Sequence, residues 1–385
     1  MARAGTPDEE RWESRANGTS RIPVLLTERR MIEGNQDPGV LFVLGAPRSG
    51  TTWLAKIFDS HPDVLYVNEP DIVLREERLP VLCRVEDVER YRDVARVYLD
   101  RLIDVRTLKA AGSLPVFQKN YRSALACRLR SGIIYGLHLA EFASGGGLWV
   151  DRIRIPELVD RSSGQTPMTV IKSVSARGRA RIFAEALPGS RIVFVMRHPC
   201  GAIASLLRGI GLRKMPKPSR ADEVLTTDQA GRLGLTAERF EPLSLVQKLA
   251  WHWAILNQKV LDDLAGMSGV MIVRYEDVVA DAAPMAQELL AFAGLPWCQQ
   301  TADFVARSTT YQGPDRYFSV WKNSRATAVG WRNQLSAGEQ LEILDIVHRV
   351  PAGRLFPEPE GSSRPVGRQC PESAEIRVPQ PAGFG

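Results

Sequence analysis

The stretch VLFVLGAPRSGTTWLAKIF, residues 40–58, decides the fold of this chain. Its first five residues are continuously apolar, which is typical of a strand buried on both faces of a parallel sheet. Two glycines, Gly45 and Gly50, then bracket a short loop, and residues 53–58 read as the first turns of a helix. A strand, a glycine-containing loop and a helix in this order predict an α/β protein whose loop holds a phosphate or sulfate group.

Further strands and helices are expected on the carboxyl-terminal side of this stretch. Strand character recurs at residues 168–171, 191–196 and 270–273, and helices are expected near residues 176–186 and 284–292. The alternation predicts a P-loop-like three-layer fold, with a mainly parallel central sheet and helices on both faces. Residues 71–167 read as mostly helical, because apolar side chains recur there at spacings of three or four: Val85, Val88, Tyr91, Val94, Tyr98 and Leu102.

The remaining segments set the expected domain boundaries. Residues 1–37 are polar and predict a flexible arm, residues 38–356 a single domain, and residues 357–385 a disordered tail rich in Pro, Gly and Ser. Residues 209–240 lack helical periodicity and predict a long surface loop with at most one short helix.

The composition excludes several classes of protein. With 44% hydrophobic and 24% charged residues in 385, the chain is neither wholly disordered, nor collagen, nor coiled coil. A net charge of +6 suits an anionic ligand but does not require a nucleic-acid partner. Five scattered cysteines without a C-x-x-C pair, and no two histidines at metal-ligand spacing, predict no metal site. Without a signal peptide or an apolar run of ~20 residues, we expect a cytoplasmic protein with no membrane span.

The loop departs from the Walker A pattern in an informative way. Gly45 and Gly50 keep the G-x-x-x-x-G-K-[ST] spacing, but Thr51 stands where that pattern has lysine. Arg48 can replace the missing charge, and the N–H groups of residues 49–53 can face an anion at the helix start. The apolar run 191–196 ends in Arg197 rather than in a magnesium-binding Asp. The pattern favours a phosphate or sulfate bound without metal; the alternative is a purely structural glycine turn.

Two stretches together resemble a known family. GAPRSGTTWL, residues 45–54, is similar to the 5′-phosphosulfate loop of sulfotransferases that use 3′-phosphoadenosine 5′-phosphosulfate (PAPS), and RHPCGAIAS, residues 197–205, is similar to their 3′-phosphate segment. The resemblance implies that Arg197 and Ser205 bind the 3′-phosphate. It also implies that the phosphosulfate is bound by Arg48, Ser49, Gly50, Thr51 and Thr52.

Four further donor-binding residues follow from the same resemblance. RYED, residues 274–277, resembles a family segment whose tyrosine lies near the adenine, here Tyr275. Lys322 and Arg325 lie in a stretch that resembles the basic loop closing over the 3′-phosphate, although its spacing drifts from the cytosolic pattern. Trp53 matches an aromatic residue that stacks on the adenine; the alternative is that Trp53 is a core residue.

The catalytic base departs from the cytosolic members. Those have a histidine after a Lys-Thr or Lys-Ser pair, whereas here Val174 follows Lys172-Ser173. HPDVLYVNEP, residues 61–70, instead resembles carbohydrate and tyrosylprotein sulfotransferases, which implies Glu69 as the general base. The alternative is a structural acid that pairs with Arg48 or Arg75. Lys172 would neutralise charge on the bridging oxygen, or else only pair with an acid. Ser173 would steer Lys172 or touch the donor.

The resemblance implies sulfonyl transfer from PAPS, without metal, to a hydroxyl or amine of a small-molecule or carbohydrate acceptor. Adenosine 3′,5′-bisphosphate (PAP) would be released, and the segments 71–167 and 209–240 would bind the acceptor. A P-loop nucleotide kinase or hydrolase is the first alternative, and it would need ATP and Mg²⁺. A catalytically inactive PAPS-binding homologue is the second. The sequence identifies neither the acceptor nor the oligomeric state.

Overall fold

The computed structural model describes residues 39–145, 152–160, 164–216, 221–313 and 319–356. The predicted amino-terminal arm (1–37) and carboxyl-terminal tail (357–385) lie outside these residues, so both stay predictions. All the features below belong to the unit that begins at Pro38.

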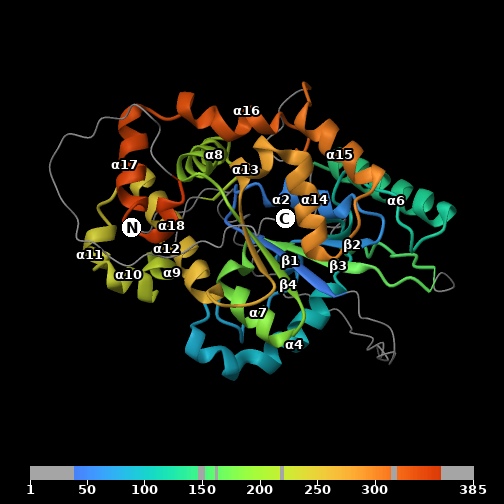
Figure 1. The fold of residues 1–385 in the computed structure, drawn as a ribbon, viewed down its shortest axis with the longest axis horizontal. Coiled ribbons are helices and arrows are strands. Elements are labelled where there is room, and N and C mark those ends of the chain that lie inside the picture. The colour runs from blue at the N-terminus through green and yellow to red at the C-terminus, as the bar shows by residue number, and fades with distance from the viewer. Residues whose placement is uncertain (1–38, 146–151, 161–163, 217–220, 314–318, 357–385) are drawn as a thin grey trace, which may run out of the picture. The chain divides into compact units, whose positions relative to one another are not determined.

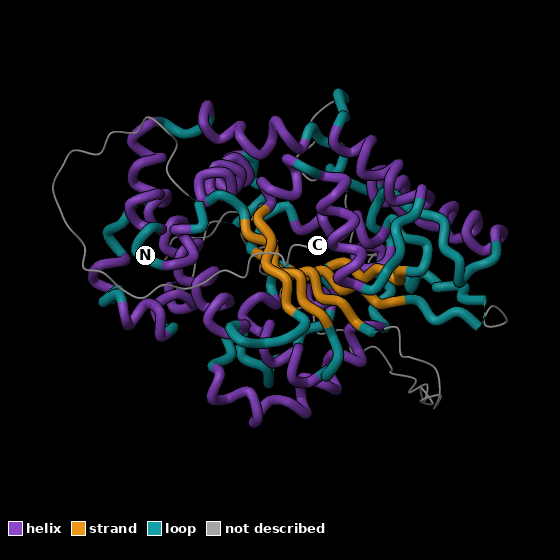
Figure 2. The backbone as a smooth tube through the Cα atoms, in the orientation of Figure 1, coloured by secondary structure: helices purple, strands orange, loops and turns teal. Residues whose placement is uncertain are grey.

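A five-stranded parallel sheet forms the centre of this unit (Figure 2). Its strands are β1 (Val40–Gly45), β2 (Val64–Asn68), β3 (Met168–Ser173), β4 (Arg191–Met196) and β5 (Val270–Arg274). Their order in the sheet is β2-β3-β1-β4-β5, and every neighbouring pair is parallel. The carboxyl ends of all five strands therefore meet at one edge, where ligands bind in open α/β sheets.

Helices cover both faces of the sheet (Figure 1). Successive side chains of β1 point to opposite faces: Phe42 and Leu44 belong to one hydrophobic cluster, and Leu41 and Val43 to another. The first cluster extends into α4, α7, α8, α12 and α17, and the second into α2, α13, α14 and α15. The structure therefore confirms the predicted α/β fold with helices on both faces.

Local sequence signals fix several helix boundaries. α2 begins directly after Gly50, α8 begins with Pro199 at its first position, and Ser244 caps α12 in a reciprocal capping box with Gln247. The helices are α2 (Thr51–Asp59), α3 (Pro70–Val73), α4 (Val88–Ile103), α5 (Leu108–Ala111), α6 (Ala124–Ala143), α7 (Ala180–Ala186), α8 (Pro199–Gly211), α9 (Ala221–Leu225), α10 (Asp228–Arg232), α11 (Ala237–Phe240), α12 (Leu245–Leu264), α13 (Tyr275–Ala280), α14 (Ala282–Ala293), α15 (Gln299–Thr309), α16 (Ser324–Val329), α17 (Ala337–Val347) and α18 (Pro351–Arg354). The described residues also form the 3₁₀ turns η1 (Val85–Asp87), η4 (Ala176–Arg179) and η5 (Gly330–Asn333).

The segment 71–167 is helical in part. The helices α3 to α6 lie in this segment. α4 buries Val88, Tyr98 and Leu102 of the predicted apolar stripe. Val85 lies outside α4 in η1 and is exposed, so the stripe begins at Val88. Residues 112–123, between the end of α5 at Ala111 and the start of α6 after its capping residue Ser123, form no helix.

The prediction for residues 209–240 was wrong. After the end of α8, this segment folds into three short helices, α9, α10 and α11, rather than a surface loop. Val224, Ala230 and Phe240 are buried in the core cluster. Helices of four or five residues are too short to show the periodicity of a buried face, and tertiary packing stabilises them instead.

Candidate functional site

The loop between β1 and α2, here called the phosphate loop (residues 46–50), needs glycine at both of its boundaries. A Cβ on Gly50 would lie 2.2 Å from Cδ2 of Tyr275, and Gly50 has a φ of 91°. A Cβ on Gly45 would lie 2.6 Å from the Val195 carbonyl oxygen. The backbone can therefore pass close to its neighbours and turn into α2. The capping residue Gly50 has no side chain to bond the first N–H groups of α2, and these groups follow directly after the loop.

Three residues predicted to bind the donor come together beside this loop. The Nε of Arg48 donates a hydrogen bond of 3.0 Å to the Oγ of Ser205 on α8. Arg197, at the end of β4, donates from Nη1 to the Arg48 carbonyl at 3.0 Å and from Nη2 to the Thr327 carbonyl at 2.8 Å. Arg48 has a positive φ of 70°, which is uncommon for a residue with a side chain. Adjacent parallel strands β1 and β4 thus place the two arginines side by side.

Two buried donors at this site find no partner among the described residues. The Oγ of Ser49 and the Nε of Arg197 are both buried and unbonded there. Ser49 is 1% exposed and Arg197 is 6% exposed. Buried polar groups are nearly always hydrogen-bonded, so these two donors fit an anion that would lie between the phosphate loop and Arg197.

Two aromatic residues of the site, Trp53 and Tyr275, are buried next to the phosphate loop and contact each other. Trp53 is 6% exposed, donates from its indole nitrogen to the Oγ of Ser308 at 2.9 Å, and meets Tyr275 edge-on. Burial raises the pKa of Tyr275, whose ring also lies 5.1 Å from the guanidinium of Arg197. Trp53 therefore has the packing of a core residue, which is the alternative interpretation, while its stacking on adenine stays a prediction.

The carboxyl-terminal segment reaches the same place. Asn323 caps α16, and the Thr327 carbonyl within that helix accepts the hydrogen bond from Arg197. Lys322 is half-buried just before α16, and Arg325 is exposed and donates to the Ala280 carbonyl at 3.3 Å. The structure therefore brings this segment to the arginine of β4, while the contact of Lys322 and Arg325 with a phosphate stays a prediction.

The predicted catalytic pair meets at the ends of the neighbouring strands β2 and β3. The Glu69 amide donates to the Lys172 carbonyl at 2.7 Å, and the Nζ of Lys172 donates to the Glu69 carboxylate. Glu69 has a left-handed φ of 45°, which turns the chain from β2 into α3. Glu69 therefore pairs with Lys172 rather than with Arg48 or Arg75, and a second lysine, Lys109 of α5, lies 4.0 Å from its other oxygen.

The environment of Lys172 works against its positive charge. Its side chain is 3% exposed, and burial lowers its pKa despite the neighbouring Glu69 carboxylate. The Glu69 side chain is 17% exposed, so solvent and an acceptor can reach the carboxylate more easily than the ammonium.

A buried carboxylate that the sequence analysis missed holds the adjacent serine. Ser173 donates to Oδ2 of Asp71 at 2.7 Å and accepts hydrogen bonds from the amides of Ser175 and Ala176. Burial raises the pKa of Asp71, and its Oδ1 has no partner among the described residues. These contacts occupy the Ser173 hydroxyl, so this residue holds the turn after β3. Ser173 ends β3, and Asp71 lies in α3 just after the neighbouring strand β2, so the pairing of these two strands brings the residues together.

The histidines have structural contacts. His61 is 1% exposed and its Nε2 lies 2.9 Å from the Pro296 carbonyl. The ring of His198 stacks on Trp331, and burial lowers its pKa to about 3. In the described ranges, no three His, Cys, Asp or Glu side chains are grouped as metal ligands would be. Nor does any helix described here have the length and apolar character to cross a bilayer.

A comparison with profiles of protein families identifies the family of this chain. The sequence profile of the Sulfotransferase family matches residues 38–299. No curated protein matches the chain in sequence. Among solved structures, the sulfotransferase domain of the Synechococcus PCC 7002 olefin synthase is 17% identical, with a TM-score of 0.40, and the match covers 84% of this chain and 98% of that one. Mouse sulfotransferase SULT7A1 complexed with PAP is 12% identical, with a TM-score of 0.39 and coverage of 83% and 87%. Because the family profile spans well over half of the residues, this chain belongs to the sulfotransferase family.

Proposed function

We propose that this sulfotransferase moves a sulfonyl group from PAPS to a hydroxyl or amine of a small-molecule or carbohydrate acceptor and releases PAP. The observation that carries the proposal is the pair of buried donors, the Oγ of Ser49 and the Nε of Arg197, that find no partner in the described part of the chain and lie beside the start of α2 and Arg48. These groups fit the phosphates of the donor with no metal ligand among them. PAPS supplies the activated sulfonyl group, and the residues of this chain bind and orient it.

On the donor side, two sets of residues would bind the two anionic groups of PAPS. The amides at the start of α2 and the side chains of Ser49 and Arg48 bind the 5′-phosphosulfate. Arg197 and Ser205 bind the 3′-phosphate, and the hydrogen bond from Arg48 to Ser205 ties the two places together. The guanidiniums offer planar, charge-assisted hydrogen bonds that need no rearrangement of the strand ends.

On the acceptor side, Glu69 would accept the proton and Lys172 would stabilise the leaving oxygen. Glu69 accepts the proton of the attacking hydroxyl and becomes neutral. Its attraction for the Lys172 ammonium then weakens, and Lys172 can donate a hydrogen bond to the oxygen that leaves the sulfur. The ion pair in the structure supports the proposal, because it places Glu69 and Lys172 beside each other at the ends of neighbouring strands.

A calorimetric titration tests this function against the alternative of a nucleotide kinase or hydrolase. We expect the protein to bind PAP without Mg²⁺ and more tightly than ATP. Incubation with sulfur-labelled PAPS and a panel of alcohols, phenols, amines and sugars should yield a labelled product. Tighter binding of ATP with Mg²⁺ than of PAP would contradict the proposal. Tight PAP binding with no labelled product from the panel would favour an inactive PAPS-binding homologue.

A further inference from the structure

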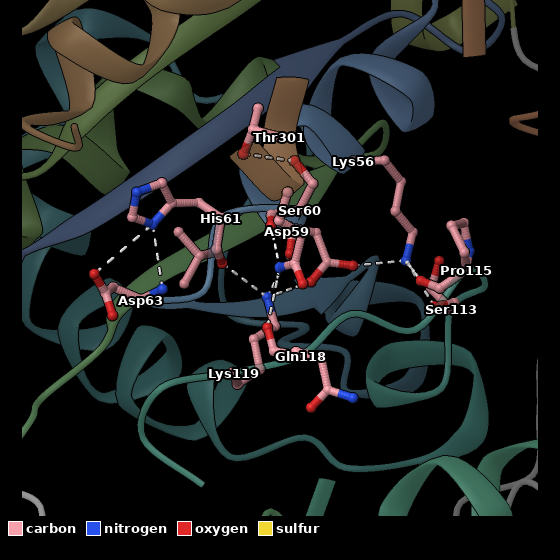
Figure 3. A network of polar contacts seen from close by, with 12 residues as sticks. Lys56, Asp59, Ser60, His61, Asp63, Ser113, Pro115, Gln118, Lys119 and Thr301 are labelled. Carbon is pink, nitrogen blue, oxygen red and sulfur yellow. Dashed lines mark hydrogen bonds and ion pairs between the residues drawn. The ribbon is translucent and has the colours of Figure 1, made fainter. Parts of the chain in front are cut away.

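A second cluster of buried charges lies at the carboxyl end of α2, opposite the end that bears the phosphate loop (Figure 3). Asp59, the last residue of α2, stands between two lysines. Lys56 donates to Oδ2 of Asp59 at 2.7 Å and to the carbonyls of Ser113 and Pro115. Lys119 donates to Oδ1 of Asp59 at 3.0 Å and to the carbonyls of Asp59 and His61. Two ammonium groups thus share one carboxylate.

The same imbalance recurs beside them at Glu157. Arg122 and Arg130 both form ion pairs with this carboxylate, and both side chains are at least nine-tenths buried. Counting only Lys56, Lys119, Arg122 and Arg130 against Asp59 and Glu157, the cluster has four positive and two negative charges. Uncompensated buried charge is costly, because desolvation exceeds what distant counter-charges return.

A small cavity lies within this cluster. It has a volume of about 20 Å³, and its lining includes Tyr66, Lys119, Arg122, Arg130 and Glu157. Arg130 is 6% exposed, and its Nε has no acceptor among the described residues. Since a water molecule needs roughly 10–15 Å³ of such volume, this space suits one water or one monoatomic ion better than a sulfate or phosphate.

The charges favour an anion over water. Burial lowers the pKa of Lys119 to about 8 and that of Arg130 to about 10, and it also lowers the pKa values of Lys56 and Arg122. A water molecule could accept a hydrogen bond from the Arg130 Nε but could not offset the excess charge. A halide ion does both, because it accepts hydrogen bonds from N–H donors and carries a negative charge.

We propose that this cavity, here called the cationic cavity, binds one halide-sized monovalent anion, with chloride as the natural occupant, between Arg130 and the residues that surround Asp59. The anion would stabilise the contacts of α2 with residues 113–122 and with α6. It would act on the stability of the fold, independently of the donor site.

Crystals soaked in sodium bromide test the occupant directly. At the bromine absorption edge, we expect one anomalous peak inside the cationic cavity, next to the side chain of Arg130. A cavity that contains only density for water, with no anomalous signal, would overturn the proposal. This measurement uses the unaltered protein and so does not depend on any variant that fails to fold.

Thermal unfolding in solution gives a second readout. At equal ionic strength, chloride should raise the unfolding midpoint by about 2–4 °C relative to gluconate, which is too large for the cavity. Arg130→Gln should lose this difference. Arg128→Gln, a change of the same charge on the exposed face of the same helix, should keep it. Equal midpoints of the unaltered protein in the two salts would contradict the proposal.

Discussion

At the phosphate loop, Arg197 makes its hydrogen bonds to carbonyl oxygens, whereas at the ends of β2 and β3 Lys172 pairs with the carboxylate of Glu69. Neutral partners hold the arginine in place and leave its charge available to an incoming anion. The carboxylate holds the lysine in place and offsets its charge. In the mechanism that we propose, the first arrangement would bind the donor and the second would take up the proton of the acceptor.

Among the variants that test this comparison, Glu69→Gln should have the largest effect. Without a base, kcat should fall by about 10²–10⁴-fold, because proton transfer by a positioned group contributes that much. Binding of PAP, measured by calorimetry, should change little, since Glu69 lies on the acceptor side. Glu77→Gln, an exposed acid in the same segment, serves as the control. Unaltered turnover in Glu69→Gln would remove Glu69 from the mechanism.

Arg197→Ala should affect the other side. Loss of charge-assisted hydrogen bonds to the donor should raise the KM for PAPS by about 10–100-fold, and the KM for the acceptor should stay nearly constant. Steady-state kinetics with each substrate varied in turn measures both values, with the exposed Arg96→Ala as the control. An unchanged KM for PAPS would mean that Arg197 does not contact the donor.

Gly50→Ala tests whether the close packing of the loop requires glycine. The added Cβ would meet the ring of Tyr275 at 2.2 Å, so we expect a loss of about 1–3 kcal/mol in the free energy of unfolding, together with weaker PAP binding. Gly189→Ala has a similar φ, 84°, with no atom within 4 Å, and separates the backbone strain from the clash. Equal losses in the two variants, measured by chemical denaturation, would show that Tyr275 does not restrict the loop.

The smallest effect is expected at Asp71. Burial raises its pKa above 3.8 in the folded protein, so its contribution to stability is present at low pH and declines as the pH rises through the folded pKa. Asp71→Asn should remove this decline while its amide oxygen still accepts the hydrogen bond of Ser173. Unfolding midpoints of both proteins between pH 4 and pH 8 measure the difference. Parallel curves would show that Asp71 stays ionised.

Much of the fold follows from local patterns in the sequence. The run at residues 191–196 coincides with β4, and residues 40–44 lie within β1, because buried parallel strands are continuously apolar. The three short helices in residues 209–240 were missed, since four or five residues carry no periodic signal. Their burial depends on α12, a contact that no local pattern records.

The sequence predicted which residues belong to the site, but not most of the contacts between them. Arg197 and Ser205 were expected to share one phosphate, with Arg48 in the neighbouring loop. In the structure, Arg48 donates to Ser205 and accepts through its carbonyl from Arg197, so it connects the two. The pairing of Glu69 with Lys172 needed the order of the strands, because β2 and β3 are neighbours only in the folded sheet. The charges at Asp59 and Glu157 come from segments up to about a hundred residues apart, and only the structure shows them together.

A crystal structure with PAP tests the central claim most directly. We expect the 5′-phosphate on the amides at the start of α2 and the 3′-phosphate on Arg197 and Ser205, with no metal ion between the phosphates and the protein. A phosphate loop that leaves PAP unbound but holds ATP through Mg²⁺ would contradict it.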